Sequence, residues 1–214
     1  MNAPLRNALI VGARGFGREV LAYIADDNPL FRIKGFLDTD PHVLDGYGRD
    51  VAVVASPFEY LPQPGEAFLA AVGDPRQRFK YTATLRDVHH VDFATVVHPR
   101  ANVSRHARLG RGCILGPNVG ISVDVRVGEF SCIQEYTVIG HDAQVGNWCQ
   151  INSHCTIAGG ARIGDFVTIH PNCVITSGAV IGDGVTVAPG SVVIGRIPPG
   201  ITVLGNPARR FSFR

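Results

Sequence analysis

An aliphatic side chain recurs at every sixth position of this chain from Val91 to Val193 without a break. A helix repeats every 3.6 residues and a strand every 2, so neither element explains a period of six. A hexapeptide repeat is typical of a parallel β-helix, in which three short faces make one coil of about 18 residues. The series is Val91, Val97, Val103, Leu109, Leu115, Ile121, Val127, Ile133, Ile139, Val145, Ile151, Ile157, Ile163, Ile169, Ile175, Ile181, Val187 and Val193.

The residue two positions before each aliphatic supports the same interpretation. From Ala101 to Ser191 these residues are all small or β-branched, which a narrow and closely packed interior requires. Four of the five cysteines occupy this position, so packing is their expected role: Cys113, Cys149, Cys155 and Cys173. The fifth, Cys132, has no Cys-x-x-Cys partner. The pattern predicts neither a disulfide framework nor a thiolate metal site.

Length and charge limit the remaining possibilities. A chain of 214 residues suits one large or two small domains, and the repeat leaves a first domain of roughly 85 to 90 residues. The net charge is +2 and no basic run occurs, so nucleic acid is not an expected partner. No apolar stretch approaches ~18 residues, and no secretory signal pattern is found at the N-terminus. We therefore expect a soluble, cytoplasmic protein without a membrane partner.

The first domain begins with a buried parallel strand over residues 8–13. Gly12, Gly15 and Gly17 follow in the spacing G-x-x-G-x-G, and residues 18–25 have helical periodicity. A strand, a glycine-rich turn and a helix form a place where backbone amides can meet phosphate. The spacing differs from the dinucleotide motif G-x-G-x-x-G, so a plain scaffold with tightly packed glycines is the alternative.

A second strand over residues 33–37 ends at Asp38, where an acidic side chain can contact a ribose. Further strands are expected over 51–55 and 67–72, and a helix is expected to follow Gly73. The first domain is therefore predicted to be a small doubly wound α/β unit.

Residues 18 apart should stack on one another, which sorts the repeat into three columns. In one column the aliphatic is followed every time by glycine, at 110, 128, 146, 164 and 182. Glycine at that corner indicates either a backbone conformation that other residues rarely adopt or an approach of neighbouring atoms too close for a Cβ. In a second column the following residues form an outward ladder that suits either a solvated face or a trimer interface or cleft: His98, Gly116, Gln134, Asn152, His170 and Ala188.

The third column places His141 at a turn, with Asp142 beside it. One coil further along lie Gly159 and Gly160, roughly 5 Å away by strand spacing. An imidazole next to a carboxylate and an open glycine turn could act as a general base beside space for an acyl group. A surface histidine in a turn is the alternative reading. No two histidines are five residues apart, as a zinc site of the β-helical carbonic anhydrases requires, so no metal is expected.

Seven segments of the chain resemble the bacterial sugar acetyltransferases of the sialic acid O-acetyltransferase (NeuD) type, which include nucleotide-amino-sugar N-acetyltransferases. These segments are residues 11–20, 36–38, 71–74, 96–99, 138–142, 155–160 and 203–209. The resemblance implies an α/β Rossmann-like domain over residues 1–88. An all-β left-handed parallel β-helix with a short C-terminal tail would follow over 89–214. It also implies a homotrimer that uses acetyl-CoA as co-substrate, a nucleotide-sugar acceptor and no metal.

The resemblance also implies residue roles. His141 would be the general base, Asp142 would orient it, and Gln134 would stand in place of an Asn that helps to fix the site. Gly159 would donate its N–H to the thioester carbonyl. Acetyl-CoA would be held by Gly159, Gly160, Ser177, Asn206, Pro207 and Arg209. The nucleotide sugar would be held by Gly12, Gly15, Phe16, Gly17, Asp38, Gly73 and Arg78.

Three functions are consistent with the sequence. N-acetylation of a nucleotide-linked amino sugar leads, because the first domain offers a nucleotide pocket. O-acetylation of a sugar such as sialic acid is the second candidate. The third is a trimeric binding module without catalysis.

Overall fold

The first part of the chain is a three-layer α/β unit built on a parallel sheet. The computed structural model describes residues 6–27, 31–48 and 50–211. The sheet has the order β3-β2-β1-β4-β5. Its strands are β1 (Arg6–Val11), β2 (Phe31–Leu37), β3 (Val53–Ala55), β4 (Ala67–Ala70) and β5 (Asp92–Phe93). The helices are α1 (Gly15–Asp27) and α2 (Pro75–Ala83), and α2 continues as a π-helical turn over Thr84–Val88.

The helix α2 begins where the sequence predicts, directly after Gly73. Asp74 is its N-cap, and the carboxylate accepts a hydrogen bond of 2.7 Å from the amide of Gln77. Pro75 follows at the first helical position, where the missing N–H costs nothing. The cap fixes the start of α2 beside the carboxyl ends of β1 and β4.

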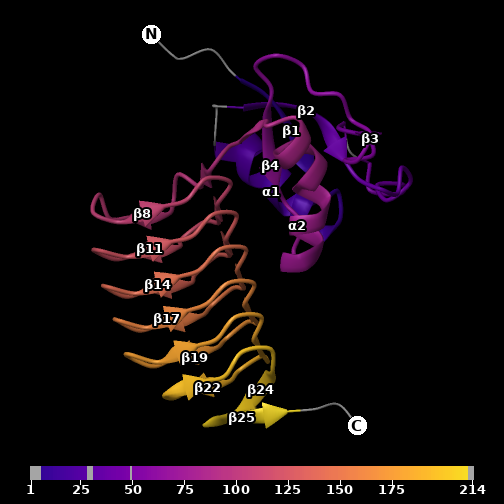
Figure 1. Cartoon of the computed structure of the whole chain (residues 1–214). Coiled ribbons are helices and arrows are strands. Elements are labelled where there is room, and N and C mark those ends of the chain that lie inside the picture. Colours follow the sequence, from indigo (N-terminus) through magenta and orange to yellow (C-terminus); the bar gives the residue numbers. More distant parts are fainter. Residues whose placement is uncertain (1–5, 28–30, 49, 212–214) are drawn as a thin grey trace.

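The second part is a parallel β-helix whose coils stack to form three sheets, and all of its strands except the last two have two residues (Figure 1). The β6 sheet contains β6 (Val96–Val97), β9 (Ile114–Leu115), β12 (Cys132–Ile133), β15 (Gln150–Ile151), β18 (Thr168–Ile169), β21 (Thr186–Val187), β24 (Thr202–Gly205) and β25 (Ala208–Phe211). The β7 sheet contains β7 (Asn102–Val103), β10 (Gly120–Ile121), β13 (Val138–Ile139), β16 (Thr156–Ile157), β19 (Val174–Ile175) and β22 (Val192–Val193). The β8 sheet contains β8 (Arg108–Leu109), β11 (Arg126–Val127), β14 (Gln144–Val145), β17 (Arg162–Ile163), β20 (Val180–Ile181) and β23 (Arg196–Ile197).

The expected fold class, an α/β domain followed by a parallel β-helix, is confirmed. The register follows the repeat, since Ile121 pairs with Ile139 and Ile139 with Ile157. The aliphatics and the small residues two before them form one continuous buried core along the coils.

Two ends of the β-helix differ from the regular repeat. Val91, the first member of the aliphatic series, packs in the first domain, and β5 pairs with β4 of the first sheet. We propose a domain boundary close to residues 88 and 89, with β5 reaching back across it. At the other end Val180 pairs with Arg196, so the last coil is shorter than the others, and β24 and β25 close the fold as an antiparallel hairpin.

The column in which glycine follows each aliphatic residue is explained by the short distance between the backbones of successive coils. A Cβ at Gly146 would lie 2.6 Å from the carbonyl of Gly164, one coil away. The left-handed backbone conformation occurs two positions later in the repeat, for example at Trp148 with φ 60°. Glycine is therefore needed at this corner because successive backbones nearly touch there.

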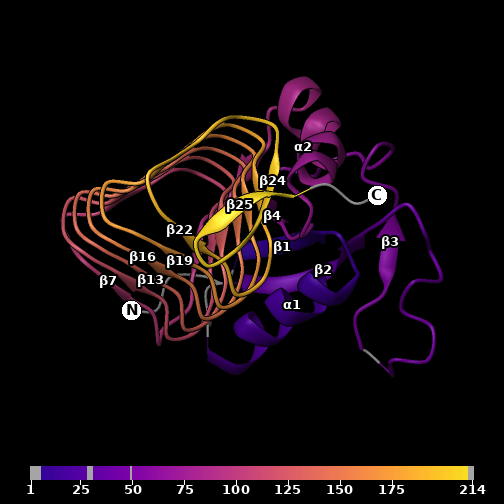
Figure 2. The ribbon, with the colours of Figure 1, turned by 90° about the horizontal axis from the view of Figure 1, so that it is seen from below.

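The first domain packs on the β6 sheet. Val96, Ile114 and Cys132 point outward from that sheet and share one buried cluster with Ala8 and Ile10 of β1. In Figure 2, β1, β4 and α2 lie beside the face that carries β24, and the β7 sheet lies on the other side of the β-helix. Within the residues described, neither helix has the length and apolarity that crossing a bilayer needs.

Candidate active site

His141 lies at the corner between β13 and β14, where the β7 and β8 sheets meet. Its Nδ1 is 2.8 Å from Oδ2 of Asp142, and the two side chains are 66% and 67% exposed. A carboxylate at this distance favours the tautomer that carries the proton on Nδ1, which leaves Nε2 free to accept a proton. The pair is therefore an oriented base that a solute can reach.

Gly159 lies directly against this imidazole. A Cβ built on Gly159 would be 2.7 Å from His141 Nε2 and 2.8 Å from its Cε1. Gly140 is restricted in the same way, because its Cβ would be 2.7 Å from the Gly159 nitrogen. The structure thus brings together His141, Asp142 and Gly159, as the column arithmetic predicts.

The backbone around Gly159 leaves one donor available. Its carbonyl accepts a 2.8 Å hydrogen bond from the Ser177 hydroxyl, and the Gly160 amide donates to the His141 carbonyl at 2.8 Å. The Gly159 amide donates no hydrogen bond to any described residue. At the next corner of the β-helix, the equivalent amide of Glu129 donates to the side chain of Asn147 at 2.8 Å. The Gly159 N–H is therefore free to meet an oxygen beside His141.

The remaining residues expected to hold acetyl-CoA lie in the closing hairpin. Asn206 and Pro207 are exposed between β24 and β25, and the peptide bond that joins them is cis. Arg209 is exposed and donates to the Ala208 carbonyl at 3.0 Å. No contact among the described residues links this hairpin to Gly159 or Ser177, so their shared role stays a prediction.

Gln134 lies at a different corner, between β12 and β13. Its amide nitrogen is 3.4 Å from Glu19 Oε2 of α1, and no described contact joins it to His141. It lines a cavity of about 460 Å³ between the start of α2 and the β6 sheet. The other lining residues are Gly73, Asp74, Pro75, Gln150, Asn152, Thr168, His170 and Thr186. Within one chain, Gln134 is therefore not part of the His141 corner.

A second cavity, of about 220 Å³, lies in the first domain. It is lined by four of the residues expected to bind nucleotide, Gly12, Phe16, Asp38 and Gly73, together with Arg14, Ala71, Val72, Asp74, Gln77 and Tyr81. The two cavities share Gly73 and Asp74. Gln77 and Tyr81 were not among the predicted site residues, although their spacing of four places them on one face of the helix after Gly73.

Asp38 holds the glycine-rich turn in place. Its Oδ2 accepts a 2.9 Å hydrogen bond from the Ala13 amide, and Oδ1 accepts one of 3.1 Å from Asp40. Gly17 is buried against the carbonyl of Gly12, where a Cβ would collide, so packing explains this glycine. Gly15 does not line the cavity.

Arg78 does not line the nucleotide cavity, contrary to the prediction from the sequence. We expected it to contact the nucleotide, but its side chain is fully buried and points to the β-helix. It donates to the Cys149 carbonyl at 2.9 Å, to Gln150 Oε1 at 2.9 Å and to the Val72 carbonyl at 2.8 Å. The sequence placed Arg78 on the correct helix, but α2 turns this side chain toward the other domain.

Titratable groups shifted by their surroundings lie away from the His141 corner. Partial burial and the charge of Glu135 raise the pKa of Glu19 on α1, although Arg18 opposes the shift. Burial raises the pKa of the Cys149 thiol to about 12, so it is protonated at neutral pH. The described residues contain no group of three or more His, Cys, Asp or Glu that could hold a metal ion.

Comparisons with known proteins agree with this architecture. Residues 7–85 match the PglD N-terminal domain, and residues 160–195 match the bacterial transferase hexapeptide model of six repeats. No curated protein matches the sequence. The perosamine N-acetyltransferase PerB from Caulobacter crescentus, solved with CoA and GDP-perosamine, is 27% identical with a TM-score of 0.87, over 99% of this chain and 100% of that chain.

Two further solved structures are similar over most of their length. WeeI from Acinetobacter baumannii is 25% identical with a TM-score of 0.82, over 95% of this chain and 99% of that chain. The acetyltransferase domain of PglB from Neisseria gonorrhoeae is 26% identical with a TM-score of 0.66, over 96% and 100%. The fold and these matches define a hexapeptide-repeat acetyltransferase with acetyl-CoA as co-substrate. More specifically, the chain is similar to the sugar acetyltransferases of the NeuD and PglD type, as the sequence motifs predict.

Proposed function

We propose that this acetyltransferase acetylates the amino group of a nucleotide-linked amino sugar, with His141 as general base. One observation carries the proposal. The His141 imidazole is oriented by Asp142 at 2.8 Å, and its Nε2 faces the Gly159 backbone, whose N–H makes no hydrogen bond to a described residue. A base and an oxyanion donor at one open corner are what acyl transfer to an amine requires.

The reaction proceeds by direct transfer. Nε2 of His141 removes a proton as the acceptor nitrogen attacks the thioester carbonyl, and the new C–N bond forms. The Gly159 N–H meets the negative charge on the carbonyl oxygen, an interaction often worth about 3 kcal/mol. The tetrahedral intermediate then breaks the C–S bond, and the leaving thiolate takes the proton from His141. The products are the amide and free coenzyme A.

The proposed acetyl-CoA site runs along the corner column from Gly159 and Gly160 past Ser177. The Ser177 hydroxyl already holds the Gly159 carbonyl, which fixes the orientation of that peptide. Asn206, Pro207 and Arg209 would contact the far end of the co-substrate.

The proposed acceptor site is the cavity of Gly12, Phe16, Asp38 and Gly73. It continues through the shared Gly73 and Asp74 into the cavity lined by Gln134, which offers amide, hydroxyl and imidazole groups for a sugar. Support comes from PerB, which was solved with GDP-perosamine, a nucleotide-linked amino sugar.

This arrangement requires a second copy of the chain. The acceptor cavities lie on the β6 sheet side, whereas His141 lies at the corner between the β7 and β8 sheets, across the β-helix. An acceptor bound in one chain would therefore react at the His141 corner of a neighbour. A homotrimer with cyclic symmetry would supply three identical sites of this kind.

The test is a free-thiol release assay with acetyl-CoA against UDP-, dTDP-, GDP- and CMP-linked sugars, both amino and plain. We expect turnover with a nucleotide-linked amino sugar and a fall of roughly 10² to 10⁴ in kcat for His141→Ala. His154→Ala is the matched control, because that exposed histidine stacks on Tyr136 at another corner. Near-wild-type kcat in His141→Ala would contradict the proposed base.

Two other outcomes select the alternatives. Turnover only with hydroxyl acceptors would assign O-acetylation of a sugar. Binding of acetyl-CoA without turnover on any acceptor would favour the trimeric binding module.

A further inference from the structure

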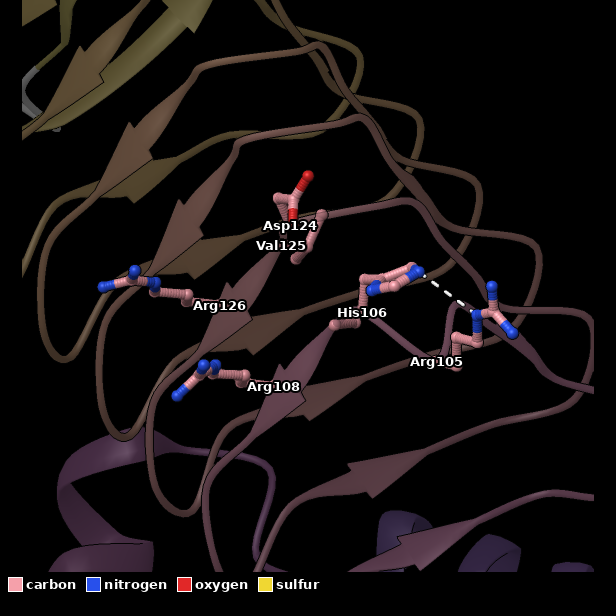
Figure 3. A pocket seen from close by; sticks show the side chains of 7 residues that line it. Arg105, His106, Arg108, Asp124, Val125 and Arg126 are labelled. Carbon is pink, nitrogen blue, oxygen red and sulfur yellow. Dashed lines mark hydrogen bonds between the residues drawn. The ribbon is translucent and has the colours of Figure 1, made fainter.

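A third cavity, of about 280 Å³, lies on the β-helix away from both acceptor cavities (Figure 3). Its lining is strongly basic for its size, with Arg105, His106, Arg108 and Arg126 against the single carboxylate of Asp124. In Figure 3, Arg108 and Arg126 extend side by side from neighbouring strands, and Arg105 lies beyond His106. The cavity therefore presents an uncompensated positive charge.

The two strand arginines are directly opposed. Arg108 pairs with Arg126 in the register of β8 and β11, so their backbones are about 4.8 Å apart. Like charges in this position destabilise a sheet. Neither guanidinium, nor that of Arg105, has an ion-pair partner among the residues described. An anion bound between the two guanidinium groups would offset this repulsion.

His106 adds a directed donor. Arg105 Nε donates to His106 Nε2 at 3.1 Å, which leaves the proton of the neutral ring on Nδ1. An anion in the cavity can therefore receive guanidinium and imidazole hydrogen bonds together. Arginine forks match phosphate oxygens in geometry, and such charge-assisted bonds are among the strongest in proteins.

The cavity lies on the same corner as the proposed base. The register aligns Val103, Ile121 and Ile139, so Arg105 is two coils from His141, or about 10 Å. It lies on the first-domain side, whereas Gly159 and Ser177 lie on the opposite side of His141. In the proposed reaction, acetyl-CoA occupies that opposite side, so an acceptor would approach across Arg105.

We propose that Arg105, Arg108 and Arg126, with His106, bind the diphosphate of the nucleotide-linked acceptor and direct its amino sugar to His141. This inference rests on the proposed function. It assigns the diphosphate to the chain that supplies the base, while the nucleoside lies in the first domain of a neighbouring copy. One chain would then hold the nucleoside, and the chain that supplies the base would hold the diphosphate.

The experiment compares the double variant Arg105→Gln/Arg126→Gln with wild type, with Arg162→Gln as matched control. Arg162 is an exposed arginine of the same sheet that does not line the cavity. We expect the KM for the nucleotide-linked amino sugar to rise at least tenfold in the double variant. The KM for acetyl-CoA and the rate with the free amino sugar, which has no diphosphate, should be unchanged, and the control should match wild type.

Three results would overturn the inference. The acceptor KM could stay unchanged, the KM for acetyl-CoA could rise instead, or the rate with the free sugar could fall equally. Calorimetric titration with inorganic pyrophosphate separates this site from the proposed function. If no acceptor is acetylated, binding of pyrophosphate by wild type and its loss in the double variant still support the site, and equal binding by both overturns it.

Discussion

The imidazole of His141 fills the space that a side chain at Gly159 would need. A Cβ at Gly159 would be 2.7 Å from Nε2, although the two residues are 18 apart in the sequence. The register that joins Ile139 to Ile157 places them on successive coils. The stacking of the repeat therefore sets the position of the proposed base against its proposed oxyanion donor.

Gly159→Ala should accordingly reduce kcat by about 10²-fold, because the added methyl displaces the imidazole from the reacting atoms. Gly120→Ala is the control, since a Cβ there would make ordinary contacts of 3.6 to 4.0 Å with Val138. Steady-state kinetics and thermal unfolding should be measured on both variants. A Gly159→Ala enzyme that is folded and fully active would mean that the imidazole position is not critical.

The β-helix and the His141 corner could be predicted from the sequence because the repeat fixes register by arithmetic. Once coils of 18 residues are recognised, Gly159 must stack beside His141 and Gly164 beside Gly146. The reason for the glycine corner needed coordinates, since both backbone conformation and closeness fit the pattern. Only the structure shows that a Cβ would meet the next backbone there.

Contacts between the domains could not be predicted in this way. No periodicity relates α2 to the β6 sheet, so the sequence did not reveal that Arg78 turns away from the nucleotide cavity. Gln134 illustrates the same limit, because the repeat defined its column but not the cavity formed when the first domain covers that column. Such placements depend on how two separate surfaces pack.

Cys149→Ala should keep kcat within about twofold of wild type. The thiol is fully buried and donates to the Gly164 carbonyl at 3.1 Å, and burial raises its pKa to about 12. It is neither accessible nor ionised at neutral pH, and the thiolate is the reactive form. Loss of that hydrogen bond should lower the free energy of unfolding by about 1 kcal/mol. A folded variant without activity would support a covalent thiol intermediate.

Glu19→Gln should stabilise the protein at neutral pH. Partial burial and Glu135 raise the Glu19 pKa above 4.5 in the fold, so ionisation of this carboxyl costs stability once the pH exceeds that value. The variant should therefore have a higher Tm than wild type at pH 7. The difference should shrink toward zero as the pH falls below 4.5, where the carboxyl is neutral in both states. Equal Tm values at pH 7 would contradict this, and Glu59→Gln, which removes a carboxylate outside α1, is the control.

Arg78→Met should weaken the attachment of the first domain to the β-helix. Removal of the guanidinium leaves Gln150 Oε1 and the Val72 carbonyl without this donor, and each such group costs about 1–3 kcal/mol, whereas the Cys149 carbonyl keeps its hydrogen bond from the Cys132 amide. We expect the free energy of unfolding to fall by about 3 kcal/mol. Arg78→Lys should restore little, because one ammonium cannot replace the two nitrogens that donate.

Trp148, the single tryptophan, reports this attachment directly. Its ring packs 5.1 Å from that of Phe79, the neighbour of Arg78 on α2. In urea denaturation followed by tryptophan fluorescence, Arg78→Met should therefore unfold at a lower urea concentration than wild type. Lys80→Met, which changes an exposed residue of the same helix, should unfold at the same concentration as wild type. An Arg78→Met variant with unchanged stability but a raised KM for the acceptor would instead indicate that Arg78 contacts the nucleotide. The structure predicts the opposite, because both terminal nitrogens of Arg78 donate to the β-helix and the side chain is fully buried.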